Sequence, residues 1–208
     1  MYPIRKFLLI TLAVLALGGG AAAVFMQLQG THELPSHATV IPTPMPLPEF
    51  ALLDHAGNQF DRQSLRGEWS LVFFGFTHCP DICPATLQQL AIARGKVLAA
   101  DGGQSKSFPQ IVLISVDPER DTVEIMREYV ANFGADIKGV TGDIDELKKL
   151  TAALGIFFEK SEDSSEDYNV AHSAVVLLIN PKAEFHALFS APHDVENFVN
   201  DVPILTGS

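Results

Sequence analysis

The feature that most constrains the fold is an apolar run that ends in a turn and is followed at once by a helical pattern. Residues 69–76 (WSLVFFGF) are almost all hydrophobic, which is typical of a strand buried on both faces of a sheet. From Pro84 onward hydrophobic side chains recur at helical spacing, with Leu87, Leu90 and Val97 on one stripe. A buried strand followed directly by a helix predicts an α/β domain.

The remaining pattern extends this domain. The further elements predicted are a hairpin at 50–60, a strand at 111–116, helices at 121–133 and 143–154, strands at 174–179 and 184–189 joined as a hairpin, and a helix at 194–202. We expect Asp121 and Asp143 to be N-caps, with Glu146 completing a capping box. Strands that alternate with helices predict a central mixed β-sheet flanked by helices.

The N-terminal segment predicts export. Residues 1–6 form a basic flank with Arg5 and Lys6, and residues 7–26 are uncharged and long enough to span about 30 Å of hydrocarbon. The basic flank indicates a transmembrane anchor whose first residues are cytoplasmic and whose following domain lies outside the cytoplasm. The alternative is a cleaved signal peptide, because residues 18–23 are small. Both interpretations place the domain outside the cytoplasm.

Residues 27–47 are polar and then rich in proline. The prolines fall at positions 35, 42, 44, 46 and 48, a spacing that favours extended, polyproline-like chain. We therefore expect a linker over 27–47 and a folded domain over 48–208.

The net charge and the number of cysteines exclude some classes of function. The chain carries 14 basic and 25 acidic side chains, and its net charge of −11 argues against a nucleic-acid partner. Two cysteines are too few for a disulfide scaffold, but they can form one redox pair or supply two soft metal ligands.

Both thiols fall at the turn between the buried strand and its helix. Cys79 and Cys83 lie in the segment THCPDICP (77–84), beside a predicted helix N-terminus that favours thiolate over thiol. A purely structural disulfide is the simpler interpretation, but so short a loop would constrain the unfolded chain little. The spacing therefore favours a redox-active pair or a shared metal ion.

Most metal ions need at least one ligand in addition to two cysteine thiolates. His172 directly precedes the predicted strand at 174–179, at a sheet end where its loop can face the cysteine turn, and His78 beside Cys79 is a competitor. For the remaining histidines, solvent-facing or capping roles are the simpler interpretation: His32, His37, His55, His186 and His193.

Two thiolates and one imidazole are soft ligands and give a low coordination number. Such a set suits Cu(I), and holds Cu(II) if water or a carboxylate completes it. Structural zinc normally takes a fourth protein ligand. Asp81 is the nearest candidate for an oxygen ligand, although a turn residue that binds backbone amides is its simpler role.

The motifs FGFTHCPDICP (74–84), SVDPERDT (115–122) and YNVAHS (168–173) resemble the Sco/SenC family of copper-binding assembly proteins. The resemblance covers roughly residues 48–203. It implies a thioredoxin-like fold, copper as Cu(I) or Cu(II) bound by Cys79, Cys83 and His172, and a role in building the CuA centre of cytochrome c oxidase subunit II. Many relatives carry aspartate before the ligand histidine, whereas this chain has Ala171, so its copper affinity or oxidation-state balance is expected to differ.

The resemblance leaves two mechanisms open. The domain is either a metallochaperone that passes copper to subunit II, or a thiol-disulfide oxidoreductase in which Cys79 and Cys83 reduce the cysteines of the CuA site. Other periplasmic copper chaperones or thiol reductants are further partners. We expect a single-pass protein of a bacterial inner membrane, with its domain in the periplasm. The acidic segment 161–167 is interpreted as a solvated loop.

Overall fold

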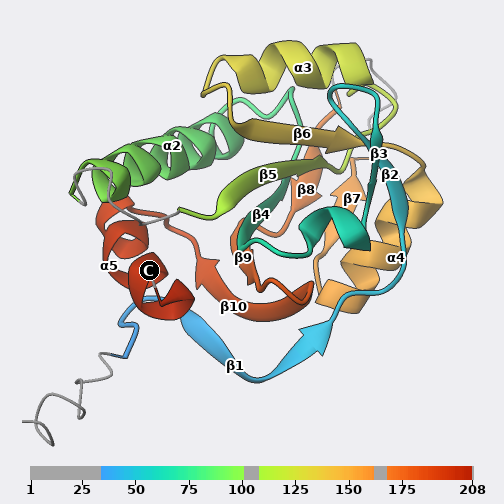
Figure 1. Ribbon diagram of the computed structural model, residues 1–208. Helices are drawn as coiled ribbons and strands as arrows, with labels where there is room; N and C mark the ends of the chain where they lie inside the picture. Colours follow the sequence, from blue (N-terminus) through green and yellow to red (C-terminus); the bar gives the residue numbers. More distant parts are fainter. Residues whose placement is uncertain (1–33, 101–107, 162–167, 208) are drawn as a thin grey trace, which may run out of the picture. The chain divides into compact units, whose positions relative to one another are not determined.

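An eight-stranded mixed sheet runs through the part of the chain that the structure describes, residues 34–100, 108–161 and 168–207 (Figure 1). The structure is a computed structural model. The strands are β1 (Thr39–Pro46), β2 (Ala51–Asp54), β3 (Gln59–Asp61), β4 (Ser70–Gly75), β5 (Gln110–Ser115), β6 (Ile137–Thr141), β9 (Val175–Ile179) and β10 (Glu184–Ser190). Their order is β1-β10-β9-β4-β5-β6-β2-β3, with β4, β5 and β6 parallel and the other pairs antiparallel.

Helices cover both sides of this sheet. They are α2 (Ile82–Ala100), α3 (Val123–Ala131), α4 (Ile144–Leu154) and α5 (Val195–Thr206), with a short 3₁₀ helix, η1 (Arg62–Leu65). α2 packs beside α5, α3 covers β6, and α4 lies on the opposite side from α2 (Figure 1). Two short strands, β7 (Phe158–Lys160) and β8 (Val170–His172), form a separate antiparallel pair. The predicted central mixed sheet flanked by helices is confirmed.

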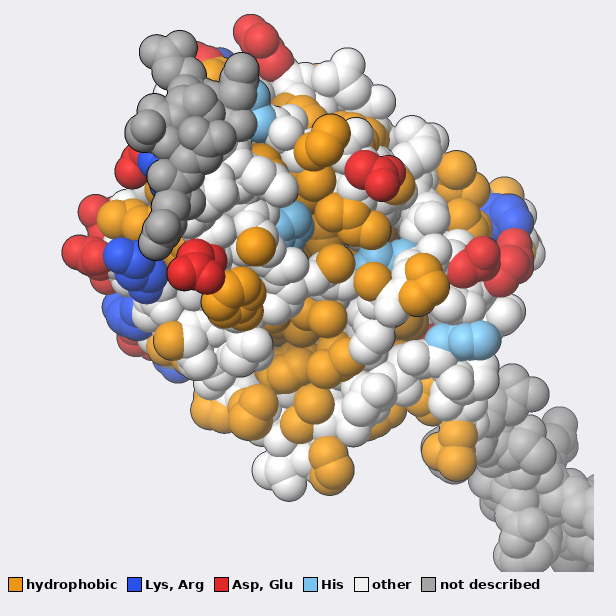
Figure 2. All heavy atoms as spheres, turned by 180° about the vertical axis from the view of Figure 1, so that it is seen from behind, with side chains coloured by type: hydrophobic (Ala, Val, Ile, Leu, Met, Phe, Trp, Pro, Cys, Tyr) orange, Lys and Arg blue, Asp and Glu red, His pale blue; other side chains and the backbone are white. Residues whose placement is uncertain are grey.

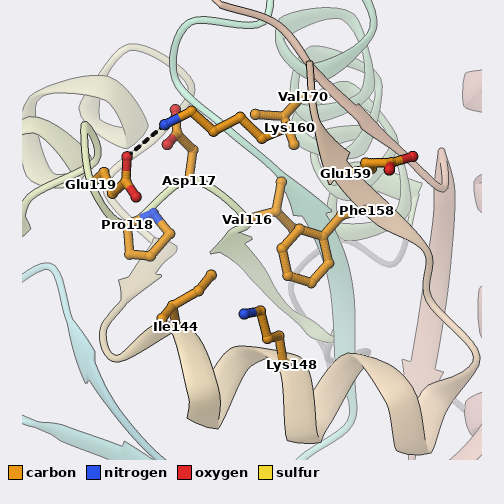
Figure 3. A pocket seen from close by; sticks show the side chains of 10 residues that line it. All are labelled: Val116, Asp117, Pro118, Glu119, Ile144, Lys148, Phe158, Glu159, Lys160 and Val170. Carbon is orange, nitrogen blue, oxygen red and sulfur yellow. Dashed lines mark hydrogen bonds and ion pairs between the residues drawn. The ribbon is translucent and has the colours of Figure 1, made fainter. Parts of the chain in front are cut away.

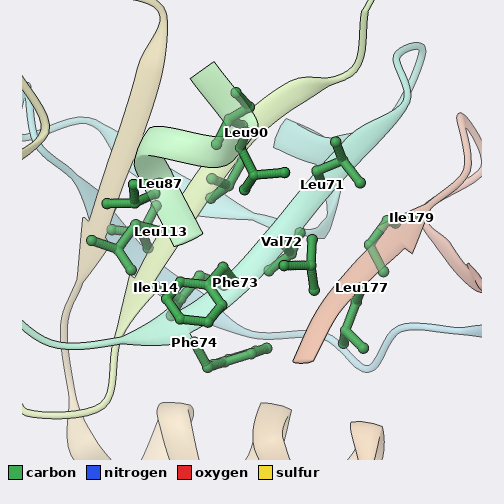
Figure 4. Packing of buried hydrophobic residues seen from close by; sticks show 14 of the residues in the cluster. Leu71, Val72, Phe73, Phe74, Leu87, Leu90, Leu113, Ile114, Leu177 and Ile179 are labelled. Carbon is green, nitrogen blue, oxygen red and sulfur yellow. The ribbon is translucent and has the colours of Figure 1, made fainter. Parts of the chain in front are cut away.

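The core forms around β4, as the apolar run at 69–76 predicts. Every residue of β4 is buried, because the strand lies between β5 and β9 and is covered on both faces. Phe73 and Phe74 pack among leucines of α2 and neighbouring strands (Figure 4). Each such side chain contributes about 1.5–3 kcal/mol on burial. The strand that carries the cysteine turn is therefore firmly anchored.

The predicted linker over 27–47 is wrong for its second half. Residues 39–46 form β1, the edge strand, which pairs with β10 at Thr39↔Leu188 and Met45↔Phe185 with a register shift between them. Proline is tolerated in edge strands, because one side of such a strand needs no backbone donor. The extended chain that these prolines favour is thus part of the sheet, and the folded domain begins before residue 48.

The predicted basic flank (1–6), membrane anchor (7–26) and first linker residues (27–33) lie outside the described residues. Within the described residues no helix is both long and apolar enough to cross a bilayer.

Several local predictions also need correction. Thr122 caps α3 in place of Asp121, whose carboxylate is buried and serves the cysteine turn. Asp143 caps α4 as expected, but the Glu146 carboxylate accepts a hydrogen bond from the Ala51 backbone N–H instead of completing a capping box. The strand β6 was not predicted, because its short sequence IKGVT contains lysine and glycine and has no clear apolar period.

Candidate metal centre

The two cysteines lie where β4 ends and α2 begins. The Cys79 side chain is 8% exposed, and Cys83, in the first turn of α2, is fully buried. Both are free thiols. The helix N-terminus brings unpaired amides and the positive end of the helix dipole to the sulfurs, as the sequence predicts.

A close approach of backbone to sulfur fixes the position of Cys83. A Cβ atom at Gly75 would lie 2.8 Å from Cys83 Sγ and 2.9 Å from the Phe73 ring. A side chain at this position would push the sulfur away, so glycine is required at the end of β4.

His172 reaches this site from β8. Its Nε2 atom lies 3.5 Å from Cys83 Sγ, and its Nδ1 atom lies 3.1 Å from the carbonyl oxygen of Val170. A carbonyl oxygen only accepts, so Nδ1–H donates to it and the Nε2 lone pair is free to face the sulfur. The rings of Phe73 and Phe76 meet the imidazole edge-on at centroid distances of 6.2 and 5.6 Å. The imidazole is therefore held with Nε2 directed toward Cys83 Sγ.

The two thiols differ strongly in acidity. The hydrogen bond from Cys83, together with the backbone amides of Asp81 and Cys83, lowers the pKa of Cys79 to about 5, against the opposing effect of burial. The hydrogen bond to Cys79 and burial raise the pKa of Cys83. Near neutral pH the site thus holds a Cys79 thiolate and a Cys83 thiol that donates its hydrogen bond to Cys79 Sγ.

We expect the reduced domain to show a thiolate transition with a midpoint near pH 5, well below the ordinary cysteine value of 9.0. Because folding lowers this pKa, the Cys79 thiolate contributes fully to stability above pH 9, and the contribution is lost as pH falls through 5. A pH titration of ultraviolet thiolate absorbance measures this transition. Cys79→Ser should remove it, and a first transition near pH 9 in the parent domain would contradict the assignment.

Asp121 holds the turn in front of the cysteines. Its fully buried carboxylate accepts hydrogen bonds from the Thr77 N–H (3.0 Å), the Thr77 hydroxyl (2.5 Å) and the Ser115 hydroxyl (2.6 Å). Buried carboxylates need such donors, because an unpaired charge in the interior is costly. Asp121 therefore links the cysteine turn to the end of β5.

The structure brings together the predicted Cys79, Cys83 and His172 by pairwise contacts. In the described residues, no group of three or more His, Cys, Asp or Glu side chains stands in an arrangement that could hold a metal ion. His78 is half exposed, with Nδ1 3.1 Å from the Thr77 hydroxyl. Asp81 is exposed and meets Cys79 through its backbone amide.

The other histidines occupy structural positions. His55 accepts a hydrogen bond from the Gly139 N–H through Nδ1, His186 lies edge-on to Trp69, and His193 is buried against Phe198. His37 is exposed, and His32 lies outside the described residues.

Four residues around the site were not predicted to support it: Asp117, Arg120, Asp121 and Tyr168. The first three directly follow the buried strand β5. Charged side chains at the carboxyl end of a parallel strand are a signal that could have indicated them, because this edge of a sheet commonly carries sites. Tyr168, four residues before His172, belongs to the motif YNVAHS, but it does not follow a buried parallel strand and its role could not be inferred in that way.

The surface of one face carries few charges at its centre. Hydrophobic side chains gather there with histidines among them, and most acidic and basic side chains lie toward the edges (Figure 2). In a chain of net charge −11, this distribution leaves a neutral area.

Comparisons with known proteins identify the family of the chain. The family model described as SCO1/SenC matches residues 42–206. The chain is 38% identical over 153 residues to the mitochondrial protein SCO1 homolog 1 of Arabidopsis thaliana, with 74% of this chain and 45% of that protein aligned. It is 30% identical over 201 residues to a Stutzerimonas stutzeri protein named for copper binding, with 97% and 96% aligned.

A solved structure has the same fold as this chain. Arabidopsis thaliana ScoI with copper bound superposes with a TM-score of 0.67 at 37% identity, covering 75% of this chain and 94% of that one. The chain spans less than half the length of the curated Arabidopsis relative. The matched region contains the cysteine turn, His172 and the whole sheet from β4 to β10, and the chain belongs to the SCO1/SenC family.

Proposed function

We propose that this protein is a copper metallochaperone that holds copper with Cys79, Cys83 and His172 and delivers it to the CuA site of cytochrome c oxidase subunit II. The observation that carries the proposal is the contact between Cys83 Sγ and His172 Nε2, which joins residues 89 positions apart in the chain. Family membership and the copper-bound Arabidopsis relative support it.

The donor set fits copper. Two sulfurs and one imidazole nitrogen are soft ligands of low number, as Cu(I) prefers. The imidazole offers Nε2 because Nδ1 is bound to the Val170 carbonyl, and such a bond also raises the basicity of a ligand histidine.

Capture of Cu(I) exchanges one proton for the ion. Before copper binds, the Cys83 thiol donates its hydrogen bond to Cys79 Sγ, and binding of copper by Cys79, Cys83 and His172 would release that proton to solvent. His172 keeps its Nδ1–H on Val170 throughout. Cys79 is the more exposed of the two sulfurs, so we propose that a ligand of the partner replaces it first during transfer.

The location proposed for this chemistry is the periplasmic face of a bacterial inner membrane. Residues 7–26 provide the proposed single-pass anchor, and the basic flank at 1–6 places the folded domain on the outer side.

A second candidate function is reduction of the disulfide at the partner's CuA site. The acidity difference favours it, because a Cys79 thiolate is a ready nucleophile and Cys83 is a buried resolving thiol. Cys79 attacks the disulfide and releases one partner thiol, and Cys83 then attacks the mixed disulfide and releases the second. Two electrons and the Cys83 proton pass to the partner, solvent supplies the second proton, and Cys79–Cys83 becomes a disulfide.

A transfer experiment tests the primary function. The reduced domain loaded with Cu(I) is mixed with a metal-free, reduced soluble CuA domain, the two are separated, and copper is measured in each. We expect copper to move to the CuA domain. Copper that stays on this chain or never binds would contradict the proposal, and reduction of an oxidised CuA domain without copper transfer would favour the second function.

A further inference from the structure

The element that carries His172 lies outside the main sheet. β7 and β8 are three residues long and pair only with each other in the described residues, with Phe158 opposite His172 and Lys160 opposite Val170. An isolated two-stranded hairpin is marginally stable in water. Other contacts must therefore hold His172 at the cysteines.

Core packing does not fill the space beneath this strand pair. A cavity of about 350 Å³ lies between it, α4 and the loop that follows β5. Val116, Ile144, Phe158 and Val170 line the apolar part of the cavity (Figure 3). The β7–β8 pair thus rests on a hollow into which it has room to shift.

Tyr168 connects the beginning of β8 to the loop after β5. Its hydroxyl donates a hydrogen bond of 2.6 Å to Asp117, whose carboxylate is buried. The guanidinium of Arg120 lies 3.6 Å from the ring centroid, and the Lys160 ammonium lies 3.8 Å from the same centroid. Two cations this close to one centroid fit only on opposite faces of the ring, so Tyr168 lies between them, and each contact is attractive.

Two carboxylates of the loop form ion pairs with the Arg120 and Lys160 cations. Arg120 donates from Nε to Asp117, and Lys160 pairs with Glu119 at 2.7 Å (Figure 3). Lys160 belongs to β7 and Tyr168 lies two residues before the start of β8, so contacts from the loop at 117–120 hold both strands. We call the set Asp117, Glu119, Arg120, Lys160 and Tyr168 the tyrosine clamp.

The clamp reaches the imidazole through one aromatic ring. The Arg120 guanidinium also lies 5.9 Å from the Phe76 ring centroid, and that ring packs edge-on against His172 at 5.6 Å. Tyr168 and His172 are four residues apart on one short, extended segment. A displacement of Tyr168 would therefore move the imidazole directly.

We propose that Tyr168 is a positioning residue, held between Arg120 and Lys160, that keeps His172 Nε2 beside Cys83 Sγ in the proposed copper site. This inference rests on the proposed copper site. Without the clamp, the β7–β8 pair can shift over the cavity and carry the nitrogen away from Cys83. Loss of a group that orients a metal ligand commonly lowers metal affinity about 10–100-fold.

The test uses Tyr168→Leu, which removes both the hydroxyl and the aromatic ring, and Tyr168→Phe, which keeps the stacking. Cu(I) affinity is measured by competition with a chelator of known affinity, and hydrogen exchange of residues 168–173 is measured in the metal-free protein. For Tyr168→Leu we expect an affinity loss of about 10–100-fold and faster exchange, with both thiols still titratable and the reduction potential of the dithiol unchanged. Tyr168→Phe should retain most of the affinity.

A second pair of variants covers the case in which Tyr168→Leu does not fold. Lys160→Met removes one exposed cation of the clamp, and Lys96→Met removes a comparable exposed ion pair with Glu196 between α2 and α5. Lys160→Met should lower copper affinity and speed exchange in 168–173, whereas Lys96→Met should do neither.

The results separate this inference from the function on which it rests. Unchanged copper affinity and exchange in Tyr168→Leu, or in Lys160→Met if the former does not fold, would overturn the clamp. Equal losses in Tyr168→Phe and Tyr168→Leu would overturn the role of the stacked ring. A parent protein that binds no Cu(I) would overturn the proposed function, and the exchange measurement would still decide whether the clamp holds β8.

Discussion

Replacing His172 with alanine is expected to lower the affinity of the reduced domain for Cu(I) by at least about 100-fold, or about 2.7 kcal/mol. The change removes the nitrogen that lies 3.5 Å from Cys83 Sγ and leaves two sulfurs to hold the ion. Competition with a Cu(I) chelator under anaerobic conditions measures this loss.

The titration and reduction potential of the two thiols are the internal control for the His172→Ala variant. Both thiols should remain titratable in His172→Ala, and their reduction potential should remain near that of the parent. His78→Ala is the matched control, because His78 is a half-exposed histidine beside Cys79 whose Nδ1 faces Thr77. An affinity for copper that is unchanged in His172→Ala but lowered in His78→Ala would assign the nitrogen ligand to His78 instead.

Oxidation of the dithiol is expected to abolish copper binding completely. Closing a disulfide between Cys79 and Cys83 passes two electrons to the oxidant, releases the Cys83 proton, and leaves neither sulfur as a thiolate ligand. Both side chains are at the same turn and share a hydrogen bond, so the pair can close without unfolding of the domain. Copper content after treatment with a thiol oxidant and gel filtration should fall from one ion per domain to none.

Reversal of this treatment is the control. Dithiothreitol should restore two titratable thiols and the bound copper together, whereas Cys83→Ser should bind copper weakly in either condition. Full copper binding by a domain with no free thiols would show that the ligands lie elsewhere.

The layers of the fold follow from sequence because its central strands are buried on both faces. The run at 69–76 and the strand at 111–116 contain almost only hydrophobic residues, and this leaves a parallel sheet covered by helices as the stable arrangement. The edge strand β1 was missed because its prolines favour extended chain whether or not a neighbour pairs with it. The short strands β7 and β8 depend on tertiary contacts that local sequence does not reveal.

Some residues of the candidate site could be predicted from the sequence and others could not. Only three residues separate Cys79 from Cys83, so their proximity follows from the turn alone, whereas the prediction for His172 rested chiefly on the family resemblance. Sequence did not predict the groups that support these residues. Asp121 was interpreted as a helix cap because an aspartate before a helix commonly has that role, but the tertiary fold buries it beneath Thr77.

The structure describes the surroundings of Ala171, where the family resemblance implies an aspartate in many relatives. Ala171 is exposed, and its neighbour Val170 supplies the carbonyl that orients His172. The orientation of the imidazole therefore depends on backbone and on the clamp, without a carboxylate at 171.

In the proposed site two sulfurs and a distant imidazole bind one copper ion. X-ray absorption spectroscopy of the reduced domain loaded with one equivalent of Cu(I) tests this ligand set, because sulfur and nitrogen neighbours of the ion can be distinguished. We expect two sulfur neighbours and one imidazole nitrogen in the parent, and loss of that nitrogen in His172→Ala. A copper ion bound by sulfur alone in the parent, or the same nitrogen signal in both proteins, would contradict it.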